Sequence, residues 1–182
     1  MFIGPPGAGV ATAIGCMLFQ FGGIPMNMME LFHREKITRY EEVPDKLAAL
    51  GISPSFNIPG YRIEILDSSS EEKADCTILV TSPDVSWEND MTSTIAMGAS
   101  DKMIVLVNKM DMYESGEAFQ KIEKEILDYF ISLGKDVTRV LIVPVSSASE
   151  ANYVEEPLRS SWYNENSMGS ATVLSALTSV LA

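Results

Sequence analysis

Four short apolar runs, rich in β-branched residues, constrain the fold of this chain more than any other feature. They cover residues 63–66, 77–80, 103–107 and 140–145. A strand with one exposed face alternates between apolar and polar residues, whereas these runs lack strict alternation. They therefore predict strands of a parallel sheet that is covered on both faces.

An amphipathic helix is predicted between the last two runs, over residues 115–133. Its apolar face consists of Phe119, Ile122, Ile126, Phe130 and Leu133. Gly134 follows at the position where glycine commonly ends a helix.

Two further helices complete the alternation of strands and helices. We expect one over residues 10–21, after a very short strand at residues 2–3, and one over residues 170–181. Residues 24–59 are expected to be irregular except for a helical piece near residues 45–50, as are residues 149–169. This order of elements implies a three-layer α/β fold with right-handed crossovers.

Length and charge narrow the function classes. The 182 residues fit a single domain, 1–182, with its own core. With 13 basic and 25 acidic residues, the formal net charge is −12, so binding to nucleic acid or to a membrane through bulk charge is not expected. The two cysteines make no disulfide framework and no membrane span is evident, so we expect a soluble, cytoplasmic protein.

Candidate functional residues follow the predicted strands. In parallel α/β sheets, functional loops lie at the carboxyl ends of the strands. Here those ends carry a glycine-rich turn at residues 4–9, a polar stretch at residues 67–70, the sequence Asn-Lys-Met-Asp at residues 108–111, and Ser146, Ser147 and Ala148.

In this order, these segments resemble the GTP-binding domain of translational GTPases, and most closely that of elongation factor 1-alpha. The glycine-rich turn lies over the family's phosphate loop, and residues 108–111 match its base-recognition motif completely. The resemblance spans nearly the whole chain. It implies a P-loop NTPase-like fold with a mostly parallel sheet, here with a shortened first strand and shortened switch regions.

The phosphate loop departs from the family pattern. Such a loop wraps a phosphate with backbone N–H groups, while a Lys neutralises charge and a Ser or Thr binds Mg²⁺. Gly4, Gly7 and Gly9 keep the frame of the loop, but Val10 stands at the Lys position and Ala11 at the Ser position. The loop either retains residual phosphate binding or is now only a tight strand-to-helix turn.

The two switch regions are also eroded. The resemblance places Ser53 where the family has a Mg²⁺-binding Thr, and Asp67 where an Asp contacts a Mg²⁺-bound water. Ser70 replaces the Gly whose amide senses the γ-phosphate, and Glu71 replaces the His that positions the attacking water. We therefore expect no metal site and no catalytic residue.

The base-recognition residues are complete. The resemblance implies that Asp111 accepts hydrogen bonds from guanine, that Asn108 ties the loop together and meets the base edge, and that the Lys109 stem covers the purine. Ser146, with the amides of Ser147 and Ala148, would face guanine O6. The alternative is that Asn108 and Asp111 only cap loops, a role for which Asn and Asp are common.

These observations lead to two functional expectations. The first is a catalytically inactive pseudo-GTPase domain that acts as a protein-interaction or structural subunit, with an unidentified protein partner and weak or no binding of GDP or GTP. The second is a guanine-nucleotide-binding protein related to translation elongation, with little or no hydrolysis. Delivery of aminoacyl-tRNA is not expected, because the family uses two β-barrel domains for it after the GTPase domain.

Overall fold

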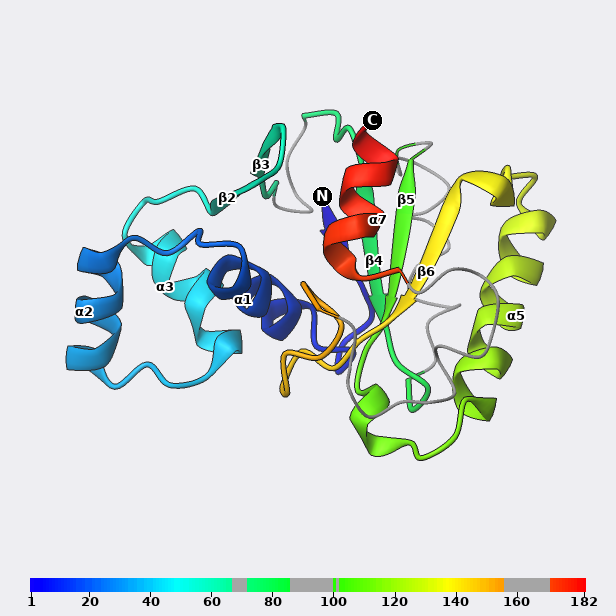
Figure 1. Ribbon diagram of the computed structural model, residues 1–182, viewed down its shortest axis with the longest axis horizontal. Helices are drawn as coiled ribbons and strands as arrows, with labels where there is room; N and C mark the ends of the chain where they lie inside the picture. The colour runs from blue at the N-terminus through cyan, green and yellow to red at the C-terminus, as the bar shows by residue number, and fades with distance from the viewer. Residues whose placement is uncertain (67–71, 86–99, 101, 156–170) are drawn as a thin grey trace.

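The centre of the fold is a four-stranded parallel sheet (Figure 1). The computed structural model describes residues 1–66, 72–85, 100, 102–155 and 171–182. The strands are β1 (Phe2–Ile3), β4 (Thr77–Thr81), β5 (Met103–Val107) and β6 (Val140–Pro144), in the order β1-β4-β5-β6. The predicted parallel sheet and its very short first strand are confirmed.

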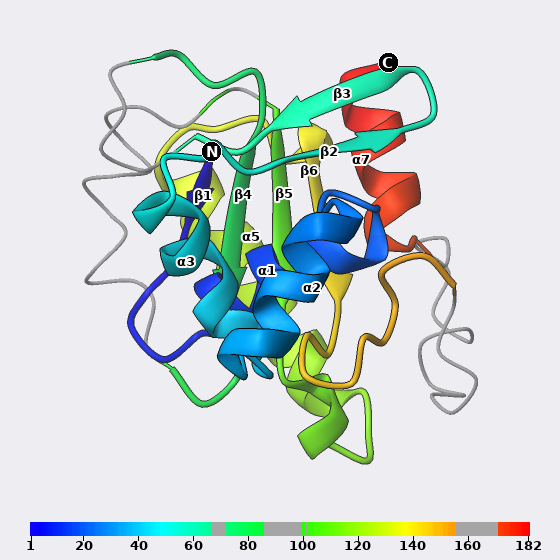
Figure 2. The same cartoon turned by 90° about the vertical axis from the view of Figure 1, so that its left-hand side faces the viewer.

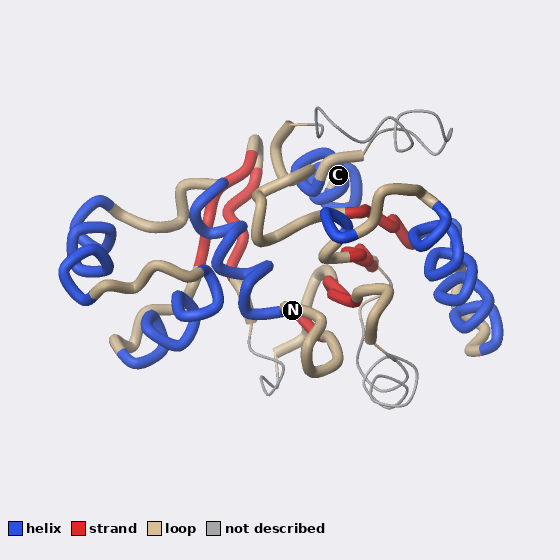
Figure 3. The backbone as a smooth tube through the Cα atoms, turned by 90° about the horizontal axis from the view of Figure 1, so that it is seen from below, coloured by secondary structure: helices blue, strands red, loops and turns tan. Residues whose placement is uncertain are grey.

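Both faces of this sheet are covered, as the lack of alternation predicts. Along β5, Val105 and Val107 pack on α5 (Glu117–Ser132), whereas Ile104 and Leu106 lie in the core shared with α1 (Val10–Gln20) and α7 (Val173–Leu181). Figure 3 shows the sheet between α5 on one side and α1 with α7 on the other. The three-layer prediction and the three predicted helices are therefore confirmed.

The segment between α1 and β4 holds more regular structure than we expected. It contains α2 (Met26–Glu35), a 3-10 turn η1 (Tyr40–Glu42), α3 (Val43–Ala49), β2 (Ser55–Ile58) and β3 (Tyr61–Glu64). Of these elements, α2 and α3 lie on the side of α1 that faces away from the sheet, and β2 and β3 lie above α1 in Figure 1 (see also Figure 2). There are two other 3-10 turns in the described residues: η2 (Met110–Met112) follows β5, and η3 (Val137–Arg139) precedes β6.

The prediction that residues 63–66 form a strand of the parallel sheet is wrong. The strand at this place, β3, pairs antiparallel with β2, and Ile58 faces Tyr61 across a two-residue turn. Gly60 in that turn has φ +85°, a conformation that glycine adopts without strain. The Pro59-Gly60 pair between two short extended runs was the signal for this hairpin.

The prediction that residues 24–59 are mostly irregular is wrong at α2. Met28 and Phe32, four residues apart, bury one face of this helix, while Met26 and Met29 remain exposed. Lys36 is the C-cap of this helix, and its positive φ ends the helix there. His33 is exposed on α2.

No helix within the described ranges is long and apolar enough to cross a membrane. Of the segments expected to be irregular after β6, residues 156–170 lie outside the described ranges.

Candidate functional site

Three of the four predicted functional loops meet at the carboxyl edge of the sheet, and the fourth, residues 67–70, lies outside the described residues. The strands run parallel, so the turns after β1, β4, β5 and β6 all leave the sheet at this edge, the lower one in Figure 1. The first of these turns leads into α1, and the other three lie beside it. One edge of the sheet thus gathers segments from four distant parts of the sequence.

The glycine-rich turn has the backbone of a strand-to-helix loop. Gly7 and Gly9 have φ values of +86° and +89°, so both adopt a conformation that favours glycine. The amide of Ala8 donates to the carbonyl of Pro5 at 3.2 Å, and Gly9 is the N-cap of α1. The loop frame that the sequence predicted is present.

The side chains at the start of α1 are apolar. Val10 is partly buried against the main core, and its Cγ2 lies only 2.6 Å from where a Cβ on Gly4 would be. Ala11 has no polar atom in its side chain. The amino terminus of the helix therefore carries neither an ammonium nor a hydroxyl at these two positions.

Asn108 joins the loops after β1, β5 and β6. Its Nδ2 donates to the carbonyl of Ala8 at 2.9 Å, and its Oδ1 accepts from both the amide and the hydroxyl of Ser147 at 2.9 Å. The side chain is buried, and Nδ2 would lie 2.5 Å from a Cβ on Gly9. The predicted tie through Asn108 is thus present in the structure.

The hydrogen bonds of Asn108 to Ala8 and Ser147 form what we call the Asn108 clamp. Next to it lies Tyr153, a residue that the sequence analysis did not predict. Its side chain is fully buried, and its hydroxyl lies 2.7 Å from the hydroxyl of Ser147. Burial raises the pKa of Tyr153, and it raises the pKa of the neighbouring Cys16 to about 12, so both groups stay protonated at neutral pH. No motif in the sequence marks Tyr153.

The loop that holds Tyr153 is also attached to the first helix. Glu150 accepts hydrogen bonds from the amide of Gln20, the last residue of α1, and from the hydroxyl of Tyr40. Burial first and then this hydrogen bond raise the pKa of Tyr40. Glu150 itself has φ +61°, so the turn is tight at this residue.

The charged residues of the base-recognition motif differ in their surroundings. The ammonium of Lys109 forms an ion pair with Asp84, in the loop after β4, at 3.0 Å. The Ser82 hydroxyl and then Lys109 lower the pKa of the Asp84 carboxyl. Asp111 is exposed, and no residue in the described ranges forms an ion pair or hydrogen bond with its carboxylate.

The residues predicted to face guanine O6 are placed together. Ser146 and Ser147 are buried, and Ser146 pairs with Ala151 through backbone hydrogen bonds. Ala148 is exposed next to them. These residues and the motif at residues 108–111 therefore share one corner of the sheet edge.

The predicted switch residues do not join this site in the described structure. Ser53 is exposed in the connection between α3 and β2, which lies toward the amino end of the sheet in Figures 1 and 2. Asp67 and Ser70 lie outside the described residues. Within the described ranges, no three side chains of His, Cys, Asp or Glu are grouped to hold a metal ion. With Ala11 also lacking a ligand atom, the residues described do not fit a magnesium site.

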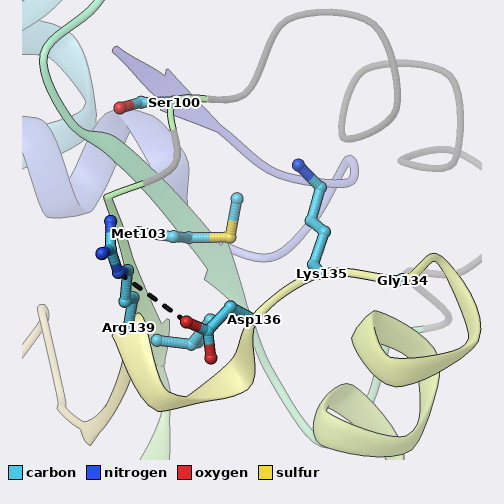
Figure 4. Close-up of a pocket in the computed structure, with 7 residues that line it drawn as sticks. Ser100, Met103, Gly134, Lys135, Asp136 and Arg139 are labelled. Atoms are coloured by element: carbon cyan, nitrogen blue, oxygen red, sulfur yellow. Dashed lines mark ion pairs between the residues drawn. The ribbon is translucent and has the colours of Figure 1, made fainter.

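A cavity lies at the opposite end of the sheet, before β5 and β6 (Figure 4). Its volume is about 220 Å³, and Lys135 and Arg139 bring positive charge to it. Asp136 pairs with Arg139 at 3.7 Å, which partly compensates this charge. The cavity is separate from the loops at the carboxyl edge.

Comparison with known proteins finds similar sequences and similar solved structures. No family model matches the chain. The chain is similar to elongation factor 1-alpha of Plasmodium falciparum, with 27% identity over 88% of this chain and 44% of that protein. Elongation factor 1-alpha of Onchocerca volvulus is 27% identical over 98% of this chain and 48% of that protein.

Solved structures share the fold. The Saccharomyces cerevisiae Ski7 GTPase-like domain, bound to GDP and inorganic phosphate, matches 97% of this chain and 47% of that chain, with a TM-score of 0.73 and 17% identity. Sup35 complexed with GMPPNP matches 97% of this chain and 42% of that chain, with a TM-score of 0.70 and 23% identity.

The sheet order and the loops on its carboxyl edge define a P-loop GTPase fold. In sequence, the chain is similar to elongation factor 1-alpha. It spans less than half of the length of the relatives that it matches.

Proposed function

We propose that this domain does not hydrolyse GTP, binds guanine nucleotide weakly or not at all, and serves as a protein-interaction or structural unit. The observation that carries this proposal is the apolar start of α1, where Val10 and Ala11 leave the phosphate loop without a charged or metal-binding side chain. The sequence adds a second argument. The family resemblance assigns to positions 70 and 71 a Gly whose amide senses the γ-phosphate and a catalytic His, and this chain has Ser70 and Glu71 there instead.

The expected loss of affinity is large. A charge-assisted hydrogen bond from a buried Lys is worth roughly 2–4 kcal/mol, and the phosphate clamp of a metal ion is worth a similar amount. Together they correspond to roughly three to five decades in Kd at about 1.4 kcal/mol per decade. A site that bound GDP at nanomolar to micromolar concentrations would then bind it at micromolar concentrations at best.

The remaining charges do not compensate for this loss. Lys109 is the cation of the base-recognition motif, and its ammonium is already paired with Asp84. The formal net charge of −12 makes the approach of a polyanionic ligand less favourable still. Electrostatics therefore support the weak-binding proposal.

One set of contacts favours the second candidate, a guanine-nucleotide-binding domain with little or no hydrolysis. The clamp at Asn108 holds the base loops against the phosphate loop, and Asp111 leaves its carboxylate available. The Ski7 GTPase-like domain has been crystallised with GTP and with GDP and phosphate, and Sup35 with GDP. A base pocket in this chain would bind guanine without a strong hold on the phosphates.

Titration of the purified protein with a fluorescent GDP analogue, with and without Mg²⁺, tests the proposal. We expect a Kd weaker than about 1 μM, no effect of Mg²⁺ and no GTP turnover above background. A submicromolar Kd would contradict weak binding. Mg²⁺-dependent turnover that disappears in Asp111→Asn would contradict the loss of catalysis.

A repair experiment separates the two candidates. If the base pocket is formed, the double variant Val10→Lys with Ala11→Ser should bind GDP at least a hundredfold more tightly, or about 2.7 kcal/mol. The matched control is Val10→Met with Ala11→Ser, which adds length without charge and should gain far less. If the repaired variant gains nothing, the base pocket is not formed and the domain is a scaffold. A large gain supports the nucleotide-binding candidate.

A further inference from the structure

Asn108 has a defined orientation in the structure, which follows from its neighbours. The carbonyl of Ala8 can only accept a hydrogen bond, so the amide nitrogen of Asn108 must face it. The backbone amide of Ser147 can only donate, so Oδ1 must face that residue. The amide group therefore cannot flip without breaking both contacts.

This orientation fixes the direction of the neighbouring hydrogen bonds. The Ser147 hydroxyl also contacts Oδ1, which is an acceptor, so Ser147 must donate its only proton to Asn108. The hydroxyl of Tyr153, 2.7 Å away, must then donate to Ser147.

The resulting chain of donors connects the loops of the site. It runs from Tyr153 through Ser147 and Asn108 to Ala8, just before α1 begins. The hydroxyl of Tyr153, the amide of Asn108 and both polar groups of Ser147 are buried, and buried networks of this kind are strong when every member is satisfied.

We propose that Tyr153 is a positioning residue that orients the Asn108 clamp through Ser147, so that the phosphate loop and the base loops are held together by the chain's own side chains rather than by a bound nucleotide. The proposal rests on the assignment of these loops under the proposed function. It requires no nucleotide to be bound.

The amide of Ser147 reports directly on the clamp, because its hydrogen bond is to Oδ1 of Asn108. Native-state hydrogen exchange of the nucleotide-free protein therefore measures how often the clamp opens. We expect Tyr153→Phe to speed exchange of this amide about tenfold, equivalent to about 1.4 kcal/mol. The amides of β5 should change much less. A purely structural loss of stability would instead speed the most protected sheet amides by the same factor.

Two further variants make the test decisive. Tyr61→Phe is a matched control, since it removes a tyrosine hydroxyl that donates to the Leu181 carbonyl at 2.9 Å, far from the clamp. Ser147→Ala removes the other end of the Tyr153 contact together with the hydroxyl's own hydrogen bond to Asn108, so it should give a selective acceleration at least as large. The double variant should then exchange no faster than Ser147→Ala alone.

Three results would overturn the proposal: no acceleration at residue 147, equal acceleration across the sheet, or additive effects of the two variants. None of them depends on nucleotide affinity, so the proposal can fail while the proposed function stands. Conversely, tight GDP binding by the unmodified protein would contradict the proposed function and leave the exchange result unaffected.

Discussion

Replacement of Asn108 by Ala should destabilise the domain more than replacement of any other residue of the base-recognition motif. The side chain is 3% exposed and makes three hydrogen bonds to the loops after β1 and β6. Asn108→Ala removes the partner of the Ala8 carbonyl and of both the amide and the hydroxyl of Ser147. All of these groups lie where few other partners are available.

The expected loss in the free energy of unfolding follows from the polar groups that Asn108→Ala leaves without a partner. Each buried polar group left without a partner costs about 1–3 kcal/mol. The hydroxyl of Ser147 can rotate, and a water molecule can enter the vacated space, so we expect a total of about 3–5 kcal/mol rather than the full sum. For a domain of this size, this loss corresponds to a fall in Tm of about 10 °C or more.

Urea denaturation at 25 °C, followed by circular dichroism, measures this loss as a change in midpoint at constant m-value. Asn108→Asp is the sharper variant, because it keeps the acceptor for Ser147 but places a carboxylate oxygen against the carbonyl of Ala8. It should be at least as destabilising as Asn108→Ala. Asp111→Ala is the matched contrast, and it should change stability by less than about 0.5 kcal/mol, as is usual for an exposed side chain. A loss below about 1.5 kcal/mol for Asn108→Ala would refute the reasoning.

Three other predictions follow from the packing and the charges. Gly15→Ala should destabilise the domain by roughly 1–3 kcal/mol in urea, because its Cβ would lie 2.1 Å from the backbone oxygen of Tyr40; the stabilisation expected from helix propensity would contradict this. Cys16 should resist iodoacetamide at pH 8 in the native protein and react only after unfolding, since burial raises its thiol pKa to about 12; rapid native labelling would contradict it. Asp84→Asn should change stability by no more than about 1 kcal/mol, because its ion pair with Lys109 is half exposed; a larger loss in urea would show a stronger role for this pair.

The central sheet was predictable because its signal is local. Continuous β-branched runs such as residues 103–107 identify strands that are buried on both faces, and Gly134 marks the end of the helix that follows. The hairpin of β2 and β3 was not predicted as such, because Ile63 and its neighbours were read as another buried run. Pairing depends on the turn at Pro59-Gly60, which fixes an antiparallel register that apolar content alone does not encode.

The site was predictable where motif residues carry it. The resemblance located the loops, and it predicted that Asn108 ties the loop together, whereas the hydrogen bond from Asn108 to Ala8 in the phosphate loop came only from the structure. Tyr153, Glu150 and Asp84 could not be found in this way, because each acts through a contact between segments that are distant in sequence. A fully buried tyrosine in a stretch expected to be irregular has no periodicity to mark it.

These contacts change what the complete Asn-Lys-Met-Asp sequence means in this chain. Asn108 has a structural task that would require an Asn at this position with or without a ligand, because it both donates to Ala8 and accepts from Ser147. Its presence is therefore no measure of nucleotide binding. Asp111 has no such task among the described residues, so guanine recognition is the role that its substitution tests. If the variant Val10→Lys with Ala11→Ser binds GDP, adding Asp111→Asn should abolish the gain in GDP affinity. The triple variant should instead bind xanthosine diphosphate, and its free energy of unfolding should stay unchanged. If Asp111→Asn has no effect on binding, the motif in this domain is a loop clamp alone.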